Sequence, residues 1–171
     1  QTQRAVDNFP ISGIKMDFPF TKSFITSLGL IKDAAARANL RLKLLPANKA
    51  RAISRAAKEV WKEKHHDQFP IDVFQTGSGT SSNMNANEVI ANLASKNSKL
   101  NIGPNDDVNM SQSSNDVIPT AIKISAHIDL TKKLYPALDK LINEIEKKAK
   151  SLKGITKTGR THLMDAMPVS Y

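Results

Sequence analysis

The sequence contains no cysteine, which excludes disulfide bonds, thiol nucleophiles and metal sites built on thiolates. This absence is compatible with a reducing cytosol. The sequence also lacks any apolar run close to the ~20 residues that a membrane-spanning helix requires, so we expect no membrane insertion. An apolar content of 40% and a charged content of 24% are those of a soluble globular protein.

The net charge is +9, and two explanations compete for it. Clustered lysine and arginine would favour nucleic-acid binding, whereas dispersed charge raises the local concentration of anionic metabolites. The lysines alternate with acidic residues along helical stretches such as 132–153. We therefore expect a small anionic partner and no nucleic acid.

The length of 171 residues allows one domain, or one domain and part of another. The chain begins at Gln1 without an initiator methionine and stops at Tyr171 with no closing helix. We expect it to be a fragment of a longer protein, so the lack of a targeting signal carries little information.

The spacing of apolar residues predicts a mainly helical chain with short extended segments. We expect a first helix over Thr21–Leu45, with Ala35 and Ala38 facing inward, and a second that begins at Pro46. Phe69–Phe74 is predicted to be extended. A third helix is expected over Asn85–Ser95.

A longer amphipathic helix is predicted toward the C-terminal end. Ser114 or Asn115 caps its start, and Pro119 is tolerated in its first turn. Pro136 kinks or restarts it, and Gly154 ends it. One face carries Leu138, Leu141, Ile142, Ile145, Ala149 and Leu152. Such a face is typical of a helix in a bundle.

Three widely separated polar segments are the candidates for chemistry. The first runs from Gly77 to Asn85 and places Ser78, Gly79 and Thr80 just before a helix, where backbone N–H groups and the helix dipole favour anions. An ordinary Ser/Gly-rich turn with a helix cap explains this composition equally well. The segment is not a P-loop, because no lysine follows its last glycine.

The second segment, Ser111–Asp116, follows the same logic. Ser113, Ser114 and Asn115 lie at a predicted helix N-terminus, which suits a carboxylate, but a plain capping motif is an equally good explanation. The neighbouring acidic residues Asp106 and Asp107 are interpreted as a loop pair rather than as paired acid and base.

The third segment, Gly159–Ala166, contains His162 between Thr161 and Leu163. His162 suits a general base or a residue that activates water, although a lone histidine in a loop is more often a surface residue. No further ligands stand at metal-binding spacing, so we expect no metal site.

Together these segments resemble the fumarase/aspartase superfamily and, more narrowly, the iron-free class II fumarases. The resemblance runs from Gln1–Ala5 through Gln75–Thr80 to Gly159–Ala166. Aspartases typically carry Gln at the place of His162, Ala at that of Ser78 and His at that of Asp107. The residues present here are those of the fumarase pattern.

The resemblance implies reversible addition of water to fumarate, giving (S)-malate, by a cytoplasmic enzyme that is mitochondrial in eukaryotes. It implies a homotetramer that needs no metal or organic cofactor. His162 would act in acid/base catalysis through an ordered water. The implied substrate-binding residues are Ser78, Gly79, Thr80, Ser113, Ser114, Asn115 and Thr161.

Two features depart from the family pattern. The family's catalytic serine lies on a later loop that these residues do not include. Its secondary dicarboxylate site usually has His directly before Pro-Asn-Asp, whereas here Gly103 precedes Pro104, Asn105 and Asp106. A second dicarboxylate is therefore expected to bind weakly or not at all.

The expected organisation is an N-terminal lyase domain over residues 1–110 and the start of a central helical-bundle domain over residues 111–171. The active site of the family combines segments from three subunits, so residues 1–171 alone are expected to be inactive. Two alternatives remain open: an aspartate ammonia-lyase of the same superfamily, and a basic helical module that binds nucleic acid.

Overall fold

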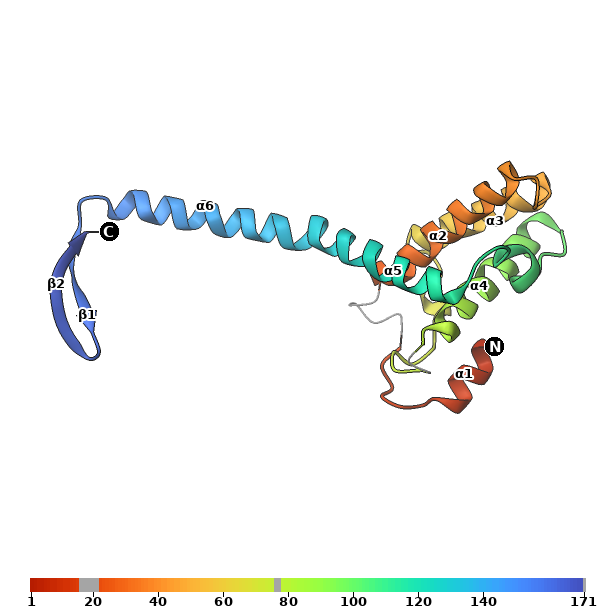
Figure 1. The fold of residues 1–171 in the computed structure, drawn as a ribbon, viewed down its shortest axis with the longest axis horizontal. Coiled ribbons are helices and arrows are strands. Elements are labelled where there is room, and N and C mark those ends of the chain that lie inside the picture. Colours follow the sequence, from red (N-terminus) through yellow and green to blue (C-terminus); the bar gives the residue numbers. More distant parts are fainter. Residues whose placement is uncertain (16–21, 76–77, 171) are drawn as a thin grey trace. The chain divides into compact units, whose positions relative to one another are not determined.

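The computed structural model describes residues 1–15, 22–75 and 78–170 (Figure 1). The chain divides into two units, Gln1–Ile128 and Asp129–Tyr171. The predicted division at residue 110 concerns the domains of a longer protein and stays a prediction.

Unit 1 is helical. Its elements are α1 (Thr2–Asn8), α2 (Lys22–Arg41), α3 (Ala47–Trp61), the 3₁₀ turn η1 (His66–Gln68), α4 (Thr80–Ser98), the π-helical turn η2 (Pro104–Val108) and α5 (Ser114–Asp129). α2 packs along α3, and α3 packs against α4. α2 and α3 approach closely at Gly29, where a Cβ atom would lie 2.8 Å from the backbone nitrogen of Trp61.

The core of unit 1 lies between α2, α3 and α4. Ile25 and Leu28 of α2, Ile53 of α3 and Ile90 of α4 are fully buried. Ile25 and Leu28 are three residues apart, an interval expected for one face of an amphipathic helix. Burial of this core supplies the main favourable term for this unit.

The predicted inner face of α2 is wrong toward its C-terminal end. Ala38 is exposed, and Ala36 is buried instead. The inner face also contains the buried polar residues Lys32, Asp33 and Asn39. An analysis of apolar periodicity cannot detect such positions, because it assigns polar side chains to the solvent face.

The predicted end of α2 is also too late. The helix ends at Arg41, because Lys43 adopts a left-handed φ of 60°. The backbone N–H groups of Leu44 and Leu45 then both donate to the carbonyl of Asn39. This turn directs Leu45 into the core, where it is buried.

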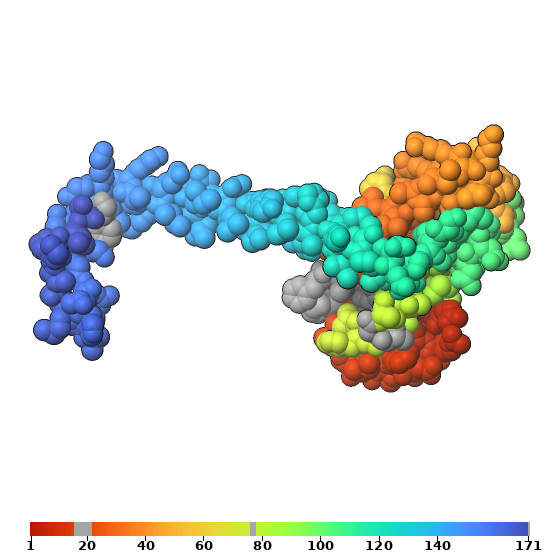
Figure 2. Space-filling view, viewed as in Figure 1, coloured from red at the N-terminus to blue at the C-terminus, as the bar shows by residue number. Residues whose placement is uncertain are grey.

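The segment predicted to be extended, Phe69–Phe74, forms an isolated antiparallel bridge between Asp72 and Lys15. The Asp72 carboxylate accepts hydrogen bonds from the backbone N–H groups of Ser12 (2.6 Å), Gly13 (3.0 Å) and Phe74 (2.9 Å). Asp72 thereby ties the N-terminal segment to the chain that leads into α4. Figure 2 shows this N-terminal segment, in red, against the yellow-green surface of that chain.

Acidification is expected to loosen this attachment. Burial disfavours the charged form of Asp72, but the hydrogen bonds from Phe74, Ser12 and Gly13 outweigh it and hold the pKa of the carboxyl below its usual 3.8. A lowered folded-state pKa contributes stability above about pH 4, and this is lost as pH falls through the folded value.

We therefore expect Asp72→Asn to lower the thermal midpoint at neutral pH, and the difference from wild type to shrink below pH ~4. Thermal unfolding followed by circular dichroism at several pH values checks this. Asp67→Asn, at an exposed site in η1, is the matched control. A difference that stays constant down to pH ~3 would contradict the assignment.

Unit 2 contains the π-helical turn η3 (Leu130–Leu134), α6 (Tyr135–Leu152) and a hairpin of β1 (Thr156–Thr161) and β2 (Met164–Ser170). Pro136 is predicted to kink or restart the helix, and α6 begins one residue before it, directly after the π-helical turn η3. Pro136 has no N–H to donate to the preceding turn, and the N–H of Tyr135 instead reaches back to the carbonyl of Leu130. Gly154, with a φ of 83°, follows the end of α6 as expected.

The apolar face of α6 is exposed along its length in the described residues. Leu138, Leu141, Ile142 and Ile145 each expose 43–59% of their surface. No helix described in unit 2 packs on this face. A contiguous apolar face of this size is a surface for association. Separately, none of the described helices is both long and apolar enough to cross a membrane.

Candidate functional site

The first candidate segment lies at the start of α4. Gly79 is the N-cap and has a left-handed φ of 76°. A Cβ atom at Gly79 would lie 2.8 Å from side-chain atoms of Ile118. The left-handed backbone and this lack of space both favour glycine at this position. The hydroxyls of Ser78 and Thr80 lie 3.3 Å apart. Gly77 lies outside the described residues.

The predicted start of α4 at Asn85 is wrong, because the helix begins at Thr80. Its first turns place Ser82, Asn83 and Asn85 in the interior. The start of the helix was predicted from the position of its apolar residues, and the first turns contain few apolar residues. The correction places Thr80 itself at the positive end of the helix dipole, where an anion is favoured.

The second candidate segment lies at the start of α5. Ser113, rather than Ser114 or Asn115, is the capping residue. Its carbonyl accepts from the N–H groups of Asp116 (3.1 Å) and Val117 (3.0 Å), and its Oγ accepts from the N–H of Asn115 (3.2 Å). Ser114 and Asn115 therefore belong to the first helical turn.

Pro119 is also misplaced by the sequence analysis. It lies inside α5, beyond the first turn, and is exposed. Ile122 is 55% exposed, and the buried residues of α5 are Val117 and Ala121. Val117 and Ala121 belong to the hydrophobic core of unit 1.

The fold brings these two segments together. Ile118 of α5 contacts Gly79, and the side-chain amide of Asn83 donates to Ser114 Oγ at 2.8 Å. The N-termini of α4 and α5 are therefore neighbours, although the sequence separates them by a whole helix. Two adjacent helix N-termini with hydroxyl and amide side chains bring together neutral donors of the kind that suit an anion.

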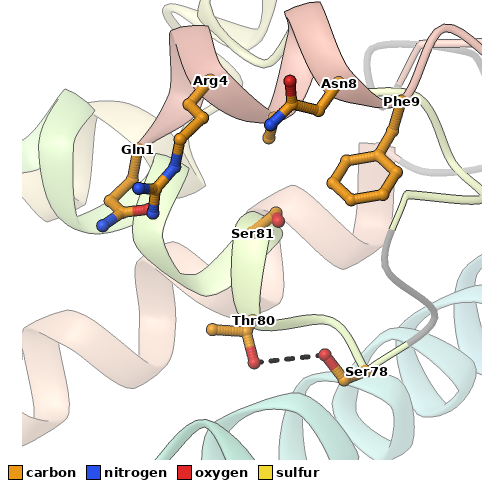
Figure 3. A pocket seen from close by; sticks show the side chains of 8 residues that line it. Gln1, Arg4, Asn8, Phe9, Ser78, Thr80 and Ser81 are labelled. Atoms are coloured by element: carbon orange, nitrogen blue, oxygen red, sulfur yellow. Dashed lines mark hydrogen bonds between the residues drawn. The ribbon is translucent and has the colours of Figure 1, made fainter.

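A hollow of about 240 Å³ lies beside the first segment, lined by Gln1, Arg4, Ala5, Asn8, Phe9, Ser78, Thr80 and Ser81. Figure 3 shows Arg4 and Asn8 of α1 facing this hollow opposite Ser81 and Thr80. Arg4 supplies a permanent positive charge beside the hydroxyls. The sequence analysis missed Arg4, because nothing in a linear sequence shows that α1 folds over the start of α4.

α1 is held in this position by Glu88 of α4. The Glu88 carboxylate accepts from the backbone N–H of Thr2 at 3.0 Å and from its hydroxyl. A carboxylate at a helix N-terminus satisfies N–H groups that have no partner within the helix. This contact fixes the wall of the hollow that contains Arg4.

A buried lysine lies behind the second segment. Lys32 of α2 is fully buried, and its ammonium donates to Asn109 Oδ1 (3.0 Å) and Gln112 Oε1 (2.8 Å). Burial lowers the pKa of Lys32 to about 7. The sequence analysis missed this residue too. Its only linear signal was a lysine among the apolar residues of α2.

Thr161 and His162 lie in unit 2, at the turn of the hairpin between β1 and β2. Thr161 pairs with Met164 across the turn, which makes His162 and Leu163 a two-residue loop. His162 has a left-handed φ of 56°, and its Nδ1 lies 3.4 Å from Thr161 Oγ1. The sequence analysis expected a loop here and did not predict the strands.

His162 and its neighbours are exposed. A histidine with positive φ at an exposed turn is uncommon, and such backbone geometry is frequent at functional sites. The side chain of His162 is therefore exposed at the tip of the hairpin.

The candidate secondary site, Gly103–Asp106, forms the start of η2. Gly103 offers only its backbone N–H, and this N–H donates to Asp107 Oδ2 at 2.8 Å. The same carboxylate is paired with Lys49 at 2.7 Å. Asp107 is therefore a buried structural residue, and the predicted loop pair separates into a buried Asp107 and an exposed Asp106.

Comparison with known proteins identifies the family. A family model described as a lyase matches residues 1–171. The chain belongs to this lyase family. The mainly helical fold predicted from the sequence is confirmed by solved structures of lyases. Class II fumarase from Schistosoma mansoni aligns with a TM-score of 0.92 and 38% identity over 99% of this chain and 36% of that one.

Other lyases of known sequence or structure are also similar. Fumarate hydratase class II from Xylella fastidiosa is 55% identical over all of this chain and 35% of its own length. The Mycobacterium tuberculosis protein of the same name is 55% identical over 99% of this chain. The fumarate lyase:delta crystallin of Brucella melitensis aligns with a TM-score of 0.91 at 42% identity.

The resemblance to class II fumarases stated from the sequence is confirmed. The chain spans about 35% of the length of the curated lyases that it matches.

Proposed function

We propose that this chain is the N-terminal portion of a fumarate hydratase, which catalyses the reversible hydration of fumarate to (S)-malate. The observation that carries the proposal is the 55% identity to class II fumarate hydratases over the whole chain. The adjacent N-termini of α4 and α5 support it, because they gather neutral donors suited to a small dianion.

In the proposed reaction the difficult step is removal of the weakly acidic C3 proton of malate. This step leaves negative charge on the adjacent carboxylate, which needs donors that are already oriented. Ser78, Gly79 and Thr80 at α4, and Ser113, Ser114 and Asn115 at α5, would supply them. Arg4 would add a charge-assisted contact from α1.

His162 would hold the water that transfers the proton, with Thr161 binding substrate beside it. Thr161 and His162 lie on an exposed hairpin that forms no site on its own among the described residues of unit 2. This exposure supports an active site assembled from several subunits. We propose a homotetramer in which the apolar face of α6 packs in a helical bundle. The proposed chemistry needs no metal or organic cofactor. The proposed location is the cytoplasm, or the mitochondrion in a eukaryote.

The test is to incubate the full-length protein with L-malate and, separately, with L-aspartate, and to follow the absorbance of fumarate. We expect fumarate from malate alone. Fumarate from aspartate alone would instead identify an ammonia-lyase. Gel retardation that weakens steeply with salt, without either turnover, would favour the nucleic-acid alternative.

The secondary site gives a further prediction. We expect a second dicarboxylate to bind weakly or not at all beside Pro104–Asp106, because the Gly103 N–H is already donated to Asp107 and Asp106 is itself anionic. Gly103→His should tighten this binding about ten- to a hundred-fold, the contribution of one charge-assisted hydrogen bond. The backbone at Gly103 is extended, and a Cβ atom there meets nothing closer than 3.7 Å.

Calorimetric titration of the full-length protein with malate below pH ~6.5, where histidine carries charge, measures this binding. Gly103→Ala is the matched control, since it adds the Cβ atom without a donor. Malate bound beside Pro104 in the unmodified protein, with no gain in the histidine variant, would show that the missing histidine is irrelevant.

A further inference from the structure

The buried lysine of α2 holds the segment that leads into α5. Lysine is almost never fully buried unless it is paired, yet in the described part of the chain the Lys32 ammonium forms no salt bridge and instead contacts two neutral amides. Those amides belong to Asn109 and Gln112. Gln112 in turn donates through Nε2 to the carbonyls of Val108 (2.9 Å) and Met110 (3.2 Å), which closes the turn directly before Ser113.

A chain of hydrogen bonds continues from this ammonium to the candidate site. Asn109 Oδ1 also accepts from Asn83 Nδ2 at 3.3 Å, and the same Nδ2 group donates to Ser114 Oγ at 2.8 Å. Asn83 is fully buried, so this link is shielded from water. Lys32, Asn109, Asn83 and Ser114 therefore connect α2, α4 and α5 in one polar network.

The direction of these bonds decides what Ser114 offers to a ligand. A serine hydroxyl has one proton and two lone pairs. Because Asn83 donates to the oxygen, the Ser114 proton is available to a carboxylate. The direction is set upstream: Asn109 donates through Nδ2 to the carbonyl of Gln112 at 3.2 Å, so its Oδ1 accepts from the protonated Lys32, and Asn83 must present its NH₂ group to Asn109 and Ser114.

We propose that Lys32 is a positioning residue for substrate binding, which fixes the 109–112 turn and, through Asn109 and Asn83, orients the hydroxyl of Ser114 as a donor. This proposal rests on the proposed function, because it assigns a role within the same dicarboxylate site. Lys32 itself is fully buried, so it acts through its neighbours.

A purely structural role is a poor explanation for a lysine at this position. Burying an ammonium is costly, and an apolar side chain of similar length would fill the same space without that cost. The pKa of Lys32, lowered to about 7 by burial, reflects this cost. A buried donor that organises several acceptors around a binding segment gives the lysine a specific use.

The experiment uses the full-length enzyme, after wild-type turnover of malate has been established. An enzyme without that turnover would end the proposed function and the role of Lys32 in malate binding with it, whereas an active enzyme whose KM does not respond to Lys32→Met would end only the assignment of Lys32. We expect Lys32→Met to raise the KM for malate about ten- to a hundred-fold, with a smaller change in kcat, because one oriented donor is lost. Lys58→Met, at an exposed position on α3, is the matched control and should leave both constants unchanged.

A double-mutant cycle with Ser114→Ala separates positioning from general stability. If Lys32 acts through Ser114, the double variant should be no worse than Ser114→Ala alone, because coupled residues are not additive. Additive effects, or a KM for Lys32→Met within about threefold of wild type, would overturn the proposal. If Lys32→Met fails to fold, Asn83→Leu decides in its place. It breaks the same link and should raise KM without adding to Ser114→Ala, and an unchanged KM refutes the assignment.

Discussion

His162→Asn in the full-length enzyme is expected to reduce kcat by about 10²–10⁴-fold while the protein remains folded, the usual cost of losing one positioned acid–base group. Asparagine is the appropriate replacement for a structural reason. His162 has a left-handed φ of 56°, which asparagine tolerates better than most residues. The hairpin turn should therefore survive, and the measurement isolates the imidazole.

Steady-state kinetics with malate and fumarate measure the effect, and circular dichroism confirms the fold. His65→Asn is a matched control, because His65 also has positive φ (64°) but lies directly before η1, outside the candidate site. It should retain wild-type kcat. If His162→Asn stays within a factor of about three of wild type, which is under 1 kcal/mol of barrier, His162 is an ordinary surface residue.

The second large effect is expected on α6. Ile142→Glu should prevent assembly of the full-length protein and so abolish activity. Ile142 is 52% exposed at the centre of a face that also contains Leu138 and Ile145. Burying each such side chain contributes about 1.5–3 kcal/mol, and a symmetric bundle multiplies this over its subunits. A carboxylate in the same position would be buried without a partner.

Size-exclusion chromatography with light scattering measures the assembly, and thermal unfolding measures its stability. Lys140→Glu also introduces a carboxylate into α6, but at a polar position outside the apolar face, and should leave the assembly intact. A tetramer that persists with unchanged thermal midpoint in Ile142→Glu would show that this face is not the bundle interface.

Much of the helical architecture follows from local rules that a sequence displays directly. The start of α3 at Pro46 and the change in helical geometry near Pro136 depend on a few neighbouring residues, so both could be predicted from the sequence. Errors arose where polar residues are buried. α4 begins at Thr80 because Asn83 and Asn85 find partners in other elements, and α2 buries Lys32 for the same reason. Such partners are distant in sequence, so no local pattern reveals them.

The sequence by itself determined the family of this protein, its mainly helical class and the residue types of the candidate site, because motifs and periodicity are properties of neighbouring residues. Only the tertiary structure decided that the N-termini of α4 and α5 are neighbours and that Arg4 faces the hollow beside Ser78 and Thr80. It also decided that the Gly103 N–H already donates to Asp107. It also decided that Lys32 connects to Ser114. The physical reason is that packing and hydrogen-bond direction depend on which surfaces meet, and in this chain those surfaces come from segments far apart in the sequence.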